Sequence, residues 1–116
     1  MGGASSSTNA HFNARQKNYL DWIPDSAVRK ITTNGTVSQR ITAMDREDSG
    51  GHRAIAVDRG GTGQDYWIGY RSLYSSNKWI KDGVVVNFGD VSINNAKPSL
   101  LDFAPSTSTK DDCAIL

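Results

Sequence analysis

Short segments in which apolar residues recur at every second position, separated by turn residues, most constrain the fold of this chain. A period of two places alternate side chains on opposite faces of an extended strand. Glycine, asparagine and aspartate between such segments favour tight turns. We therefore expect a mainly β fold with antiparallel sheets arranged as in a β-sandwich. The segments are VRKITT, TVSQRITAM, HRAIAVD, QDYWIGYRS, GVVVNFG and SLLDF, and the turn sequences are NGT, DSGG, RGGTG, SSNKW and DVSINNAKPS.

The same alternation assigns side chains to strand faces. Val37 and Ile41 share one face of TVSQRITAM, which follows the strong turn signal NGT. In QDYWIGYRS, Tyr66 and Tyr70 lie on one face and Trp67 on the other. Aromatic residues at alternating strand positions usually pack into a core, so we expect most of these rings to be buried.

One helix is expected, near the start of the chain, in HFNARQKNYLDWIPD. Thr8 or Asn9 can cap it by accepting a backbone N–H bond. Pro24 disfavours helical backbone at the residue before it, so the helix should end near Asp21. Its apolar residues fall on one helical face: Phe12, Tyr19, Leu20 and Ile23.

Composition limits the classes of partner. The formal net charge is +1, which provides no basic field for nucleic acid. No apolar run is long enough for a membrane span, so no membrane anchor is expected. Met1 is followed by small and polar residues, unlike the charged and apolar regions of a signal peptide. A single cysteine, Cys113, excludes an intrachain disulfide.

Both ends of the sequence match lipidation patterns. MGGASSS fits N-myristoylation, and CAIL fits geranylgeranylation of a terminal cysteine. The residues before Cys113 read KDD rather than a polybasic cluster, so the usual electrostatic support for membrane binding is missing. Short motifs of this kind arise often by chance, and we favour two unmodified ends.

The sequence contains no complete catalytic or metal site. Its two histidines, His11 and His52, are far apart and form no H-E-x-x-H motif. Two aspartates precede Cys113 and would raise the pKa of its thiol. The acidic stretch that begins at Asp45 reads as a solvated loop rather than a calcium site. The glycines of RGGTGQDY lack the lysine of a phosphate-binding loop and favour a tight turn.

One stretch resembles a known family. MGG followed by HFNARQKNYLDWIPD is similar to the region after the zinc-binding helix of gametolysin-like zinc metallopeptidases, which are metzincin-type enzymes. In that family a Met–Gly pair forms the Met-turn, and a helix with the pattern FNA…K…LGW follows a short loop. Asp21 stands where the family commonly has glycine. The matching residues are Phe12, Asn13, Ala14, Lys17, Leu20 and Trp22.

The resemblance continues to the end of the sequence. The segments after the helix look like the β region of the family, in the same order, and SLLDFAP is similar to its LLDMTP element. The resemblance implies that residues 1–24 are the Met-turn loop and C-terminal helix of a catalytic domain. Residues 25–116 would then be a β-rich C-terminal domain that continues beyond Leu116.

The resemblance also implies where the chemistry lies. The H-E-x-x-H-x-x-G-x-x-H helix, with three histidine ligands and a general-base glutamate, would precede Met1. Met1 and Gly2 would support the metal site from below, and Gly3, Ala4 and Ser5 would border the substrate pocket. The full-length protein would be an extracellular or periplasmic zinc endopeptidase acting on peptides or proteins. This chain alone would hold no catalytic residue and no metal ligand, and would be inactive.

Two further expectations remain open. The alternative to a protease portion is a self-standing β-sandwich module that binds protein or carbohydrate through Tyr66, Trp67 and Tyr70, which would require these rings to be partly exposed. An incomplete sheet would leave an unpaired strand edge, and such edges invite association. For the isolated chain we therefore expect marginal stability or self-association.

Overall fold

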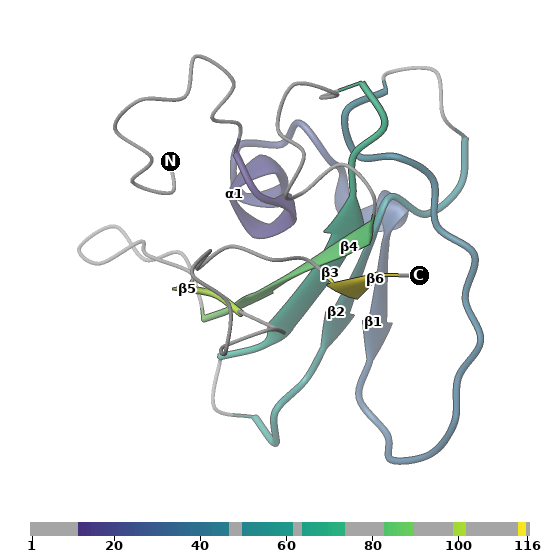
Figure 1. Ribbon diagram of the computed structural model, residues 1–116. Coiled ribbons are helices and arrows are strands. Elements are labelled where there is room, and N and C mark those ends of the chain that lie inside the picture. Colours follow the sequence, from purple (N-terminus) through teal and green to yellow (C-terminus); the bar gives the residue numbers. More distant parts are fainter. Residues whose placement is uncertain are drawn as a thin grey trace.

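The computed structural model of the chain describes residues 12–46, 50–61, 64–73, 83–89, 99–101 and 114–115. In these ranges one short helix packs against a single sheet, with a 3₁₀ turn between them in sequence (Figure 1). The expectation of a mainly β fold with one short N-terminal helix is confirmed. The elements are α1 (Ala14–Tyr19), η1 (Asp25–Ala27), β1 (Val28–Ile31), β2 (Ala54–Val57), β3 (Tyr66–Tyr70), β4 (Gly83–Phe88), β5 (Ser99–Leu100) and β6 (Ala114–Ile115).

The described strands form one mixed sheet in the order β1-β2-β3-β4. Strands β5 and β6 both pair with β4, at opposite ends of it. Every pairing is antiparallel except the first, in which β1 and β2 run parallel. The sequence led us to expect antiparallel sheets, so the parallel pair is a departure from that detail of the expectation.

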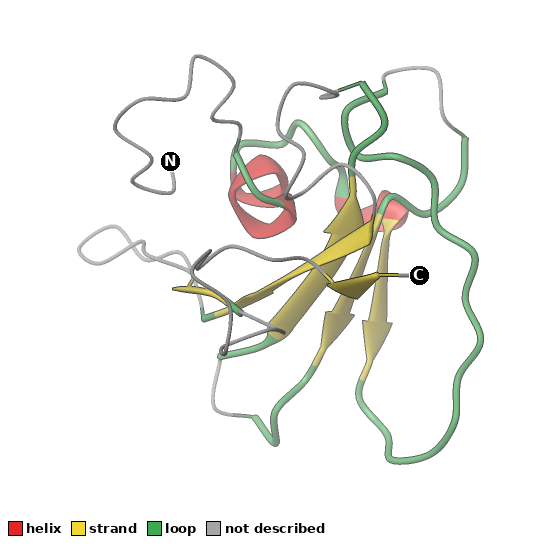
Figure 2. Cartoon of the chain, in the orientation of Figure 1, coloured by secondary structure: helices red, strands yellow, loops and turns green. Residues whose placement is uncertain are grey.

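The parallel pair follows from the long connection between β1 and β2. Parallel neighbours require a crossover of a dozen or more residues, whereas antiparallel neighbours can be joined by a tight turn. The chain does bend at NGT, but TVSQRITAM then forms no strand, and the prediction of a strand there is wrong. Figure 2 shows the connection as a long loop beside the sheet. Its later part is held by two backbone bonds, from Thr42 N to His52 O (2.8 Å) and from Met44 N to Tyr70 O (3.0 Å).

The hydrophobic core lies between α1 and one face of the sheet. Small residues on that face let the helix approach closely: Ala54 and Ala56 are buried in β2, and Gly69 is buried in β3. A Cβ atom added at Gly69 would lie 3.1 Å from the Met44 sulfur and 3.5 Å from the Ala14 Cβ atom. The core cluster contains Ala14, Ile23, Ala27, Val28, Met44, Ala54, Ala56 and Trp67.

Helix α1 begins later than the sequence suggested. Its N-cap is Asn13, whose side-chain oxygen accepts a bond from Gln16 N (2.9 Å), while Gln16 Oε1 accepts one from Asn13 N (3.2 Å). This reciprocal pair satisfies two N–H groups that a helix start otherwise leaves unbonded. The predicted caps Thr8 and Asn9 lie outside the described residues. The predicted end near Asp21 is confirmed, since the C-cap is Leu20.

The buried face of α1 is not the apolar face that periodicity suggested. The helix buries Ala14, Lys17 and Asn18, whereas Tyr19 is 47% exposed and Leu20 43%. Of the apolar residues that the sequence placed on one helical face, Tyr19 and Leu20 are therefore exposed rather than part of the core. A six-residue helix has room for only one inward stripe, and here the capped start at Asn13 and the close approach to the sheet determine which residues form it.

Candidate functional site

The site residues expected from the sequence cannot be located, because residues 1–11 are not among those described. Cys113 also falls outside the described ranges. Among the residues that the structure does describe, no three His, Cys, Asp or Glu side chains gather as a metal ion would require. The predicted Met-turn support and the predicted pocket wall both lie outside the described residues: Met1 and Gly2, and Gly3, Ala4 and Ser5.

His52 is half-buried and its ring takes part in a local polar contact. Its Nδ1 atom lies 3.2 Å from Nε2 of Gln39, and Gln39 Nε2 also donates to Arg40 O at 2.9 Å. The backbone carbonyl of His52 accepts from Thr42. These contacts join two ends of the connection between β1 and β2, so the histidine acts as a packing residue in this part of the fold.

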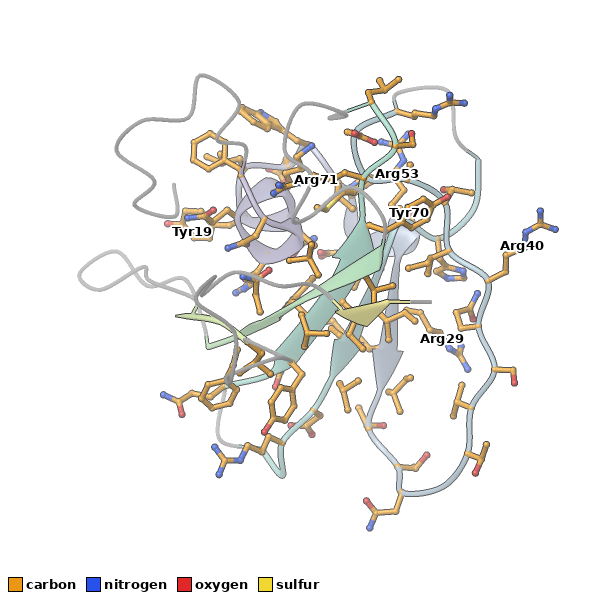
Figure 3. The ribbon with its side chains drawn as sticks, in the orientation of Figure 1. Tyr19, Arg29, Arg40, Arg53, Tyr70 and Arg71 are labelled. Atoms are coloured by element: carbon orange, nitrogen blue, oxygen red, sulfur yellow. The ribbon has the colours of Figure 1, made fainter. Side chains whose placement is uncertain are left out.

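The most unusual chemistry among the described residues lies where α1, residues 42–46 and the end of β3 meet. We call Lys17, Asp45 and Arg71 the polar cluster. Each comes from a different one of these three segments, and each makes hydrogen bonds with another part of the chain. Figure 3 shows Arg71 near α1, with Arg53 close to the same end of the sheet.

Lys17 is one of two buried cations in the polar cluster. Its side chain is only 5% exposed, and Nζ donates to the backbone carbonyl of Met44 at 3.1 Å. The pKa of Lys17 is lowered from 10.5 to about 8, mainly by burial and then by the Arg71 charge, whereas the Asp45 charge raises it. Burial disfavours the charged ammonium because the low-dielectric interior solvates it poorly.

Asp45 orders the turn that follows β3. Its carboxylate accepts bonds from Ser72 N (3.0 Å) and Leu73 N (2.8 Å). Burial alone would raise the pKa of Asp45, but these two backbone bonds and the Lys17 charge outweigh it and hold the pKa below 3.8. Asp45 lies in a turn and is only half-buried, but its carboxylate also orders the backbone after β3, which the sequence did not indicate.

Arg71 joins the end of β3 to the start of α1. It is 6% exposed, and Nη2 donates to the carbonyl of Phe12 at 3.4 Å. Its Nε atom is buried and has no hydrogen-bond acceptor, although the guanidinium as a whole has partners. The Arg71 charge lowers the pKa of Lys17, because the two buried cations lie close together. The Asp45 carboxylate has the opposite charge, so it raises the pKa of Lys17, and Lys17 in turn lowers the pKa of Asp45.

The polar cluster holds three segments in place. Lys17 binds a backbone carbonyl, Asp45 binds two backbone N–H groups, and Arg71 binds another carbonyl. Because these bonds are made to the backbone, they fix the path of the chain rather than leave the charges available to a ligand. Sequence reasoning missed Asp45 and Arg71 in this role. Only Lys17 carried a signal, since it stands in the FNA…K pattern.

The aromatic residues of β3 do not form an exposed platform. Trp67 is 4% exposed, and the guanidinium carbon of Arg15 lies 5.2 Å from its ring centroid. Tyr66 and Tyr70 are half-buried, and the ring of Tyr66 is 5.0 Å from that of Phe88. The prediction that these rings mostly pack is confirmed for Trp67.

The exposed aromatic rings lie instead at the end of α1. Tyr19 is 47% exposed and Trp22 is 54% exposed. The Trp22 ring meets that of Phe12 edge to face, with centroids 5.3 Å apart. Sequence periodicity grouped Tyr19 with the apolar residues of one helical face and did not identify this exposed surface.

Neither the search for a membrane-spanning helix nor the comparison with known proteins adds information about these contacts. Within the described ranges, no helix is long and apolar enough to cross a membrane. Comparison with known proteins found no matching family model, no similar curated protein and no similar solved structure.

Proposed function

We propose that this chain is the C-terminal portion of a secreted, gametolysin-like zinc metalloendopeptidase. In this proposal residues 1–5 form the Met-turn and border the substrate pocket, and the zinc ligands lie on a helix that precedes Met1. The helix and sheet described above would form the rigid base behind the Met-turn. The full-length protein would hydrolyse peptide bonds, and this chain alone would not.

The backbone of Asp21 is the observation that carries the proposal. Asp21 has a φ of +59°, in the left-handed region that glycine adopts without steric cost. It directly follows the C-cap of α1, where helices often end on a left-handed glycine. The gametolysin-like pattern commonly has glycine at this place. The backbone at Asp21 thus has the left-handed conformation that a glycine would adopt there easily, although the residue is aspartate.

Other positions of the pattern have matching physical roles. Asn13 caps the helix, and Ala14 packs near Gly69 on β3. Lys17 donates to the Met44 carbonyl from a buried position. The helix segment and the strand segment that carry the resemblance also contact each other, since Arg15 lies over the ring of Trp67. The proposal draws support from this shared interface between the two segments.

The decisive test is the coding sequence upstream of Met1. We expect an in-frame H-E-x-x-H-x-x-G-x-x-H motif a short distance before it. The longer protein should bind one zinc ion per chain and degrade casein, and changing the motif's glutamate to glutamine should abolish caseinolysis while zinc remains bound. A stop codon followed by a start signal directly before Met1 would refute the proposal.

The chain by itself provides the complementary test. We expect this chain to show neither stoichiometric zinc by metal analysis nor caseinolysis. The alternative of an aromatic binding platform on β3 loses support, because Trp67 belongs to the core cluster.

A further inference from the structure

Residues 36–41 have the sequence of a strand but pair with no strand in the described part of the chain. They read TVSQRI and contain the β-branched residues that pleated sheets favour. No backbone–backbone hydrogen bond joins residues 32–41 to any other described residue. Residues 32–38 are exposed, and Val37 is 43% exposed. The local sequence therefore prefers an extended, paired state that the described part of a single chain does not supply.

The sequence of this segment is complementary to itself. In an antiparallel pair centred on Gln39, Val37 of each copy faces Ile41 of the other, so the apolar contact occurs twice on one face. On the other face Ser38 lies opposite Arg40. Facing β-branched residues stabilise a strand pair, and no like charges lie directly opposite each other in this register.

Strand β1 differs from residues 36–41 in the charges that it carries. Among the described strands it pairs only with β2, so its outer edge is also open, but its two central residues are the exposed cations Arg29 and Lys30. A two-fold antiparallel pairing centred on Arg29, on Lys30 or between them sets a cation opposite a cation. Charges of this kind protect strand edges from association. Figure 3 shows the side chains of Arg29 and Arg40. Arg40 is the single charged residue within residues 36–41.

We propose that residues 36–41 form a self-association site, through which two copies of this chain pair antiparallel about Gln39. The proposal commits to a second copy because of the self-complementary register and the absence of the charge barrier that β1 carries. It does not depend on the proposed protease origin, since it concerns the isolated chain and needs no residue outside it.

The test uses the full 116-residue chain in sedimentation equilibrium over a wide concentration range. We expect a reversible monomer–dimer equilibrium for the wild type. Gln39→Lys and Gln39→Glu each place like charges opposite each other, and each should raise the dissociation constant at least about tenfold. An equimolar mixture of the two variants should recover the dimer, because the opposed charges then attract.

Two controls separate pairing from loss of local structure. Gln39→Met removes the contacts to His52 and Arg40 without adding charge, and it should still dimerise. Thr33→Lys adds a cation to the same loop outside the segment and should leave the dissociation constant unchanged. A monomeric wild type, an undiminished Gln39→Lys dimer, or a mixture that stays monomeric would each overturn the proposal.

Discussion

Asp21 and Lys17 each occupy a position whose backbone conformation or environment favours a different residue type. Asp21 has left-handed backbone, and Lys17 is a cation in a buried site. Such positions show where the fold imposes a conformation or an environment on the sequence. Their costs are measurable one residue at a time, because neither residue can relieve the strain without moving the helix end or the core.

Asp21→Gly should stabilise the chain. Glycine adopts a φ of +59° without the clash that a Cβ atom introduces, and the expected gain is about 1 kcal/mol in the free energy of unfolding. Urea denaturation followed by circular dichroism measures this change. Thr33→Gly is the matched control at an exposed loop position whose φ is not positive, and it should give no gain. Equal effects of the two substitutions would contradict the explanation.

Lys17→Met should remove a pH dependence of stability. The folded-state pKa of Lys17 is about 8 and its usual value is 10.5, so the unfolded state binds more protons between these pH values. The free energy of unfolding should therefore rise with pH from about 8 to 10.5, by at most about 3 kcal/mol from this group. We expect the rise to be smaller in Lys17→Met. The exposed Lys30→Met should retain it, and a wild-type profile in both variants would argue against a buried cation.

At the scale of elements, local patterns identified β2, β3 and β4 and the position of α1. They failed for the inward face of α1, which carries Lys17 and Asn18, and for residues 36–41, which form no strand. Periodicity reports what each segment would prefer once packed. It does not say which surface a six-residue helix meets, or whether a neighbouring strand is present.

Gly69→Val tests the contact between α1 and the sheet. The added Cβ would lie 3.1 Å from the Met44 sulfur, so the helix or Met44 must move, and the two methyl groups of valine add to the crowding. We expect a loss of about 1–3 kcal/mol in the free energy of unfolding, measured by urea denaturation. At Gly50 an added Cβ meets nothing within 4 Å, so Gly50→Val should be close to neutral. Equal losses at both sites would exclude crowding at the helix as the cause.

At the scale of the whole molecule, the sheet presents apolar residues on both faces. Trp67 and Val85 lie on the face that α1 covers, while the paired residues Ile55, Ile68 and Val86 alternate with them. Sheets that are apolar on both sides occur as middle layers of larger structures. The proposed function would place this sheet within a larger fold, and the self-association test does not depend on that placement.

The sequence by itself determined that this chain is mainly β, where its helix ends and which segments become the central strands, because these features depend on backbone preferences and on a local period. Only the tertiary structure decided that β1 and β2 run parallel, that Lys17 is buried and that Asp45 orders the turn after β3. These features depend on residues far apart in the sequence. Their hydrogen bonds and desolvation exist only once the segments pack together.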